Sequence, residues 1–213
     1  MKLSELAHGS QELLREDGFL SIKPHTFGRI RSSILQIVTF QGQKNDIYVW
    51  ANSLPLALPD LHPSAGWKNA ARRWPAAEGE VTCRDPSELR QVAKHLAALC
   101  RHEVLPYCGE LSALDRLSDA FSEDITLSAA LPKAFCHFHQ GDYLGGRQCL
   151  ERFLLDPIDR LAKRDARRYI SYSDKELADA LQAEVRANVK KHKLAPLMVA
   201  NNSSKPTPLR GAA

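Results

Sequence analysis

Apolar side chains recur every three or four residues at the start of the chain and then fall into short runs with a different period. Residues 3–15 have the spacing of an amphipathic helix, and Gly18 follows where that helix must end. The next apolar runs are rich in β-branched and aromatic side chains and cover residues 19–21, 27–30, 34–40 and 47–50. Polar segments typical of turns, residues 23–25 and 42–46, separate them. Because such short turns leave no room for crossover helices, the pattern predicts an antiparallel meander with one covered and one more exposed face.

Helical spacing dominates the second half of the chain. Asp85, Pro86 and Glu88 are typical of a capped helix start, and this helix is predicted to end near Val104, just before Leu105 and Pro106. A helix capped by Ser112 follows, and further helices are predicted over residues 131–139, 143–155, 157–170 and 173–193. Residues 53–84 contain four prolines and are predicted to be a loop with one or two edge strands.

These elements predict an α+β fold, in which an N-terminal helix and an antiparallel β-meander precede a mostly α-helical C-terminal half. We expect a sheet domain over residues 1–105 and a helical region over residues 106–195 that packs on it. Residues 196–213 are predicted to form a flexible tail, because their apolar content is too low to offset the entropy of ordering them.

Composition places the chain among ordinary globular proteins. It has 213 residues, of which 44% are hydrophobic, and a net charge of +4 that is too small to imply a nucleic acid or membrane partner without a local concentration of charge. No apolar run approaches the roughly 18 to 20 residues that span a bilayer, and the first residues lack the apolar stretch of a secretory signal. Five irregularly spaced cysteines indicate reduced thiols rather than a disulfide framework. We therefore expect a cytoplasmic protein that does not bind membranes.

Several segments of the first 155 residues resemble a known bacterial family. They are a helix ending in Asp17-Gly18-Phe19, the segment 26–29, a strand over residues 34–41, a paired strand over residues 48–52, the capped helix at 86–104 and the turn at 141–143. Together these segments are similar to the domain of unknown function 4304 family. The resemblance implies an α+β fold and a bacterial origin. It supplies no catalytic residues, because the activity of that family is unknown.

The chain lacks the residue patterns of common active sites. His137 and His139 are the best candidates for a metal site, but on a helix they point about 200° apart and cannot face one ion. No nucleophile elbow, cysteine-protease motif or phosphate-binding loop is present, and the glycines at 141, 145 and 146 are interpreted as relieving close helix packing. We therefore expect no catalytic residues, no metal and no cofactor, although an enzyme with an unrecognised site stays open.

Two sets of side chains are candidates for binding a partner. The first set lies on the predicted sheet and combines arginine, amide and aromatic chemistry, which dominates interfaces if the side chains are exposed together: Arg29, Arg31, Gln36, Gln41 and Trp67. The second set lies on the basic C-terminal helices and would suit an anionic partner: Arg160, Arg164, Arg167, Arg168, Lys190 and Lys191. Acidic residues between these cations make a solvated, salt-bridged helix pair the alternative interpretation of the second set.

The sequence therefore favours a non-catalytic bacterial protein that binds another protein through the open face or edge of its sheet. Immunity or inhibitor proteins, and accessory subunits of toxin, defence or secretion systems, belong to this class. The alternative is a nucleic-acid-binding factor or an enzyme whose site forms between the sheet and the helices.

Overall fold

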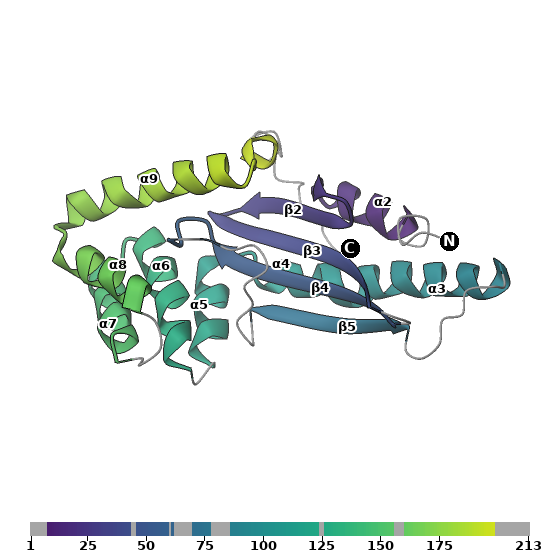
Figure 1. Ribbon diagram of the computed structural model, residues 1–213, viewed down its shortest axis with the longest axis horizontal. Coiled ribbons are helices and arrows are strands. Elements are labelled where there is room, and N and C mark those ends of the chain that lie inside the picture. Colours follow the sequence, from purple (N-terminus) through teal and green to yellow (C-terminus); the bar gives the residue numbers. More distant parts are fainter. Residues whose placement is uncertain are drawn as a thin grey trace, which may run out of the picture.

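Five antiparallel strands form the centre of the N-terminal half and follow one another in the order β1-β2-β3-β4-β5 (Figure 1). The strands are β1 (Leu20–Lys23), β2 (Thr26–Arg31), β3 (Ile34–Gln43), β4 (Asp46–Pro55) and β5 (Ala71–Ala77). The computed structural model describes residues 8–43, 46–59, 61, 70–77, 86–123, 126–155 and 160–198. The predicted meander is confirmed, and β5 is the edge strand expected within the proline-containing segment.

A two-residue hairpin turn that the sequence pattern does not predict joins β2 to β3. Ser32 and Ser33 both have positive φ, at 48° and 64°, as a hairpin turn that follows the strand twist requires. Glycine and asparagine adopt this conformation most readily, so a pair of serines does not indicate such a turn. The predicted turn between β1 and β2 is confirmed, and His25 there has a φ of 62°.

Helix α2 (His8–Glu16) precedes the sheet, and the remaining described helices follow it. They are α3 (Pro86–Leu99), η1 (Cys100–Val104), α4 (Leu105–Glu110), α5 (Leu114–Ser122), η2 (Leu127–Ala129), α6 (Ala130–His139), α7 (Tyr143–Phe153), α8 (Arg160–Ser171) and α9 (Asp174–Lys191). Gly18 follows α2 with a φ of 83°, as its predicted role in ending the helix requires. Ser173 and Glu176 form a reciprocal capping box at the start of α9. The described structure is thus α+β with a mostly helical C-terminal half.

The prediction that the helix starting at Pro86 ends near Val104 is wrong. After α3 the chain makes one π-helical turn, η1, in which the backbone N–H of Leu105 donates to the carbonyl of Cys100, and it continues directly into α4. Pro106 lies in the first turn of α4, where a missing backbone N–H is tolerated. The wider π-helical turn shifts the hydrogen-bond register just before the proline, so the helical path continues past it.

One face of the sheet is covered along its length by α2, α3, η1 and α4, and we call it the covered face. Phe27, Val38, Phe40, Val49 and Trp74 point from the strands into this layer and are at most 5% exposed. They pack against Leu14, Leu96, Cys100, Val104 and Cys108 from the helices and η1. The covered face therefore forms a closed hydrophobic layer.

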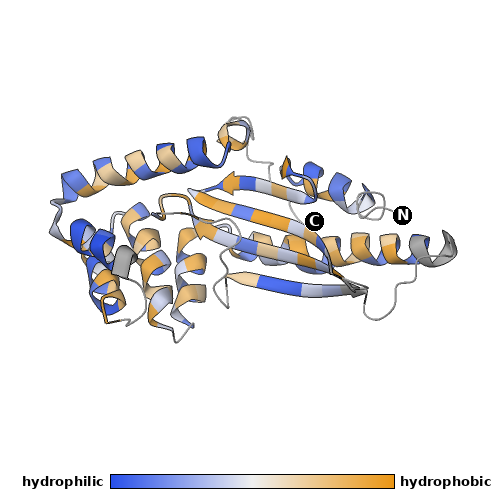
Figure 2. Cartoon of the chain, in the orientation of Figure 1, coloured by the Kyte–Doolittle hydropathy of each residue, from blue (hydrophilic) through white to orange (hydrophobic). Residues whose placement is uncertain are grey.

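The helical half of the chain packs on only part of the opposite sheet face. Ile30, Leu35, Ile37 and Leu54 join a second core with residues of α6 to α9, including Phe135, Phe138, Tyr169, Leu177 and Leu181. Along much of their length α8 and α9 carry polar residues, whereas β3 and α6 are largely apolar (Figure 2). Leu197 is also buried in this core, so residue 196 is too early a boundary for the predicted flexible tail. Residues 199–213 of that tail lie outside the described structure.

Helices α6 and α7 cross closely at Gly146. A Cβ atom at this position would lie 2.1 Å from Cε1 of Phe138, whose ring is buried. Asp142 caps α7 by accepting a hydrogen bond of 2.9 Å from the backbone N–H of Gly145. The interpretation that these glycines relieve close helix packing is confirmed at Gly146.

Candidate functional site

The five sheet residues predicted to form a binding surface do not lie together. Arg29 and Gln36 are 3% and 0% exposed and belong to the covered face. Arg31 is exposed on the same side as Arg29, and Gln41 is exposed on the opposite face. Trp67 lies outside the described residues. The predicted binding surface requires its side chains to be exposed together. Arg29 and Gln36 are buried, so this part of the prediction is wrong.

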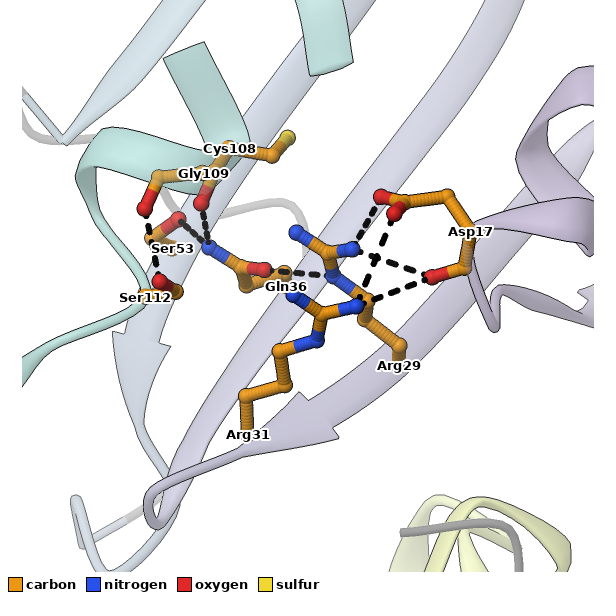
Figure 3. A network of polar contacts seen from close by, with 8 residues as sticks. All are labelled: Asp17, Arg29, Arg31, Gln36, Ser53, Cys108, Gly109 and Ser112. Carbon is orange, nitrogen blue, oxygen red and sulfur yellow. Dashed lines mark hydrogen bonds and ion pairs between the residues drawn. The ribbon is translucent and has the colours of Figure 1, made fainter. Parts of the chain in front are cut away.

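Arg29 is the centre of a buried polar network beneath α2 (Figure 3). Its Nη1 donates to the backbone carbonyl of Asp17 at 3.0 Å and contacts the Asp17 carboxylate. Its Nε donates to Oε1 of Gln36 at 2.7 Å, and its guanidinium lies 4.4 Å from the ring centroid of Phe19. Burial lowers the pKa of Arg29, while the Asp17 carboxylate opposes that shift. The ion pair and hydrogen bonds stabilise a cation that burial alone would penalise.

Gln36 extends this network toward α4. Its amide nitrogen donates to the carbonyl of Cys108 and to Oγ of Ser53, the latter at 3.3 Å. Burial raises the pKa of the Cys108 thiol to about 12, so this cysteine is a protonated core residue at neutral pH. The network joins the end of α2, three strands and α4. Because these contacts link elements of the fold to one another, we assign Arg29 and Gln36 a structural role.

The basic side chains predicted to bind an anionic partner also lie in different environments. Arg168 contacts Oε1 of Glu184 at 3.4 Å, which links α8 to α9, and Arg164 and Arg167 are exposed. Arg160 begins α8, but its side chain lies outside the described part of the chain. Lys190 and Lys191 occupy the last turn of α9, where Lys191 lines a groove on the sheet and Lys190 lines a separate notch. The contact between Arg168 and Glu184 fits the salt-bridged alternative.

The uncovered part of the second sheet face carries polar, basic and aromatic side chains, and we call it the open face. It consists of Lys23, Thr26, Thr39, Gln41, Tyr48, Trp50 and Arg73. Five of these residues form one row, because the register pairs Lys23 with Thr26, Thr26 with Thr39, Thr39 with Trp50, and Trp50 with Arg73. The row crosses all five strands of the sheet, from a lysine at one edge to an arginine at the other.

A groove of about 500 Å³ lies between the open face and the C-terminal end of α9, which extends from the helical region toward β2 (Figure 1). Its lining from the sheet includes Thr26, Thr39, Gln41 and Trp50, and its lining from the chain after α9 includes Lys193 and Leu194. A β-bulge between Ser21 and Lys23 interrupts the alternation in β1, so that Ile22 and Lys23 both line the groove. None of the described residues that line it is Asp or Glu.

Arg73 and Tyr48 form a stacked pair at the β5 edge of the open face. The guanidinium carbon of Arg73 lies 3.4 Å from the ring centroid of Tyr48, and Arg73 is exposed. Such stacking is typical of arginine and orders a long side chain that would otherwise be free. Trp50, Tyr48 and Arg73 therefore form a preorganised aromatic and cationic cluster.

Four residues of the open face are not predicted from the sequence to share one surface: Lys23, Tyr48, Trp50 and Arg73. Tyr48 and Trp50 belong to the apolar run at residues 47–50, yet both are only partly buried. The alternation of Thr39 and Gln41 with the buried Val38 and Phe40 is a signal that this face of β3 is polar. Arg73 lacks such a signal, because its strand lies in the proline-containing segment.

The histidine and cysteine residues that the structure describes do not converge on one point. His137 Nδ1 lies 2.8 Å from Oδ2 of Asp142, and the pKa of this carboxyl is lowered by the N–H of Gly145 and by His137. His139 is half-buried, and burial lowers its pKa. Among the described residues no group of three or more potential metal ligands lies together. Cys100, Cys108, Cys136 and Cys149 are free thiols, and Cys83 lies outside the described residues.

Comparison of the chain with protein-family models, curated proteins and solved structures finds no match. The resemblance to the domain of unknown function 4304 family therefore stays a prediction. In the part of the chain that the structure describes, no helix combines the length and the apolar composition that crossing a membrane requires.

Proposed function

We propose that the protein is a non-catalytic module that binds another protein through the open face of its sheet. The row of side chains from Lys23 to Arg73 is the observation that supports this proposal. Tryptophan, tyrosine and arginine are the residues most enriched at energetically important positions of protein interfaces, and Trp50, Tyr48 and Arg73 lie next to one another here. An inhibitor or immunity protein, or an accessory subunit of a larger assembly, works in this way.

Single-stranded nucleic acid is the second candidate ligand. Aromatic side chains on an open antiparallel sheet stack on bases in several nucleic-acid-binding folds, and lysines beside them contact phosphates. Trp50 with Lys23, Lys191 and Lys193 has this composition. Both candidates use the same surface, so an experiment that captures the bound molecule distinguishes them.

Site-specific photo-crosslinking in the native cells tests the proposal. The crosslinking residue p-benzoylphenylalanine replaces Gln41, which is exposed on the open face, or Lys94, which is exposed on α3 beyond the covered face. We expect a discrete protein adduct from position 41 and none from position 94. Adducts with nucleic acid at position 41 would support the second candidate, and the absence of any adduct there would contradict the use of the open face.

The identified partner then allows the surface to be measured residue by residue. Trp50→Ala and Arg73→Ala are each expected to weaken binding by about tenfold or more, as residues at the centre of an interface do. Lys94→Ala is the matched control and should bind like the unchanged protein. Normal affinity in both open-face variants would place the interface elsewhere.

A further inference from the structure

The described residues that line the groove include several lysines and no carboxylate. Lys23 lines it from β1, and Lys191 and Lys193 line it from the end of α9. The C-terminal end of α9 attracts the two later lysines, because the helix dipole is negative there. A ligand that brings carboxylates beside Lys23 and Lys193 gains charge-complementary interactions that the described lining of the groove does not supply.

The groove also has an apolar part. Ile22, Ile37 and Leu194 line it together with the indole of Trp50. Two hydroxyls, those of Thr26 and Thr39, lie 3.4 Å apart beside these side chains. A ligand that carries only negative charge would leave the aliphatic lining in water, whereas a segment with both apolar and acidic side chains covers it.

The aromatic residues of the open face favour a protein segment over a nucleic acid. The ring of Tyr48 is stacked by the Arg73 guanidinium at 3.4 Å, so that ring face is occupied. Among the described lining of the groove, Trp50 and the partly buried His192 carry aromatic rings, and the apolar lining besides Trp50 is aliphatic. Nucleic-acid platforms rely on several free aromatic faces for successive bases.

We infer that the groove binds an acidic, amphipathic segment of the partner protein, with its apolar side chains on Ile22, Leu194 and Trp50 and its carboxylates beside the lysines. This inference rests on the proposed function and names the chemistry of the partner at the same surface. The partner segment completes the second layer on the sheet where the helical half of the chain leaves it uncovered.

Three fluorescein-labelled probes test the inference by anisotropy with the full chain. The first is a short amphipathic peptide of leucine and glutamate, the second is the same peptide with lysine in place of glutamate, and the third is an oligothymidylate. We expect the acidic peptide to bind at least about tenfold more tightly than either of the others, and its affinity to fall as salt is raised.

Two double variants locate the binding. Lys23→Glu with Lys193→Glu reverses the charge of the groove, and Arg90→Glu with Lys94→Glu makes the same change of net charge on exposed residues of α3. We expect the groove variant to bind the acidic peptide at least about tenfold more weakly and to prefer the lysine peptide. The α3 variant should bind both peptides like the unchanged protein. If circular dichroism shows that the charge reversal disturbs folding, Lys23→Gln with Lys193→Gln serves instead. This variant should bind the acidic peptide more weakly without coming to prefer the lysine peptide.

Four results would overturn the inference. Equal binding of the two peptides, or equal losses in the groove and α3 variants, would remove the role of the lysines. Tighter binding of the oligothymidylate, lost in the groove variant, would assign the groove to nucleic acid. No binding of the acidic peptide, combined with a protein adduct from position 41, would leave the proposed function in place and reject only the acidic segment.

Discussion

The two faces of the sheet use the same residue types for different purposes. Arg29 and Gln36 lie on the covered face, are almost inaccessible to water and connect the sheet to α2 and α4. Arg73 and Gln41 lie on the other face and are exposed. The covering layer, and not the side chain itself, decides whether an arginine or glutamine stabilises the fold or is free to meet a partner.

The largest expected difference between the faces comes from a pair of neighbouring positions on β3. Phe40 is 2% exposed and packs edge-on against Phe27, so Phe40→Ala should lower the free energy of unfolding by about 3 to 5 kcal/mol. Gln41 is exposed, and Gln41→Ala should change it by less than about 0.5 kcal/mol. Urea denaturation of the two variants measures both values. Similar losses at the two positions would contradict the assignment of the faces.

Arg29 and Arg73 provide a second matched pair. Arg29→Met leaves the buried oxygen of Gln36 without its donor and leaves the partly exposed carboxylate of Asp17 with Arg31, at 3.5 Å, as its remaining described ion pair, which should cost about 2 to 4 kcal/mol. Arg73→Met removes only a stacking contact at an exposed site and should cost less than about 1 kcal/mol. Thermal and urea unfolding measure the two losses, and a loss at Arg29 as small as that at Arg73 would show that the buried network contributes little.

The thiols beneath the covered face give a smaller, pH-dependent effect. Burial raises the pKa of Cys100 to about 11, whereas an unfolded thiol ionises near its ordinary value of about 9. The contribution of Cys100 to stability is therefore complete below about pH 9 and is lost as pH rises toward about 11, at up to about 1.4 kcal/mol per pH unit. Cys100→Ala should show a shallower decline over this window, when unfolding is measured at several pH values. Parallel curves for the two proteins would contradict a dry environment for this thiol.

Local patterns were enough to predict most elements of the fold. The alternation along β3 and the capping residues at Ser173 and Glu176 act within a few residues, and the structure places a strand and a capped helix there. The exception is Pro106, because the π-helical turn that precedes it depends on a hydrogen bond from Leu105 to Cys100 that no composition rule indicates.

The candidate site was much harder to predict than the elements. Alternation along the strands does place Arg29 on the side of Phe27 and Gln36 on the side of Val38. Their burial could therefore have been predicted from the strand pattern. The open face could not be predicted in this way, because the row from Lys23 to Arg73 can be recognised only when the register of all five strands is known. The groove further depends on where α9 ends, which the helical period does not specify.

Fluorine NMR of 5-fluorotryptophan protein tests the difference between the faces most directly. Trp50 belongs to the open face and is partly exposed, while Trp74 is 5% exposed on the covered face, and single Trp→Phe variants assign their resonances. A soluble nitroxide should broaden the Trp50 resonance strongly and leave that of Trp74 sharp, and addition of the acidic peptide should restore the Trp50 signal. A Trp50 resonance as well protected as that of Trp74 in the absence of any ligand would contradict an open face, and with it the binding surface proposed for this protein.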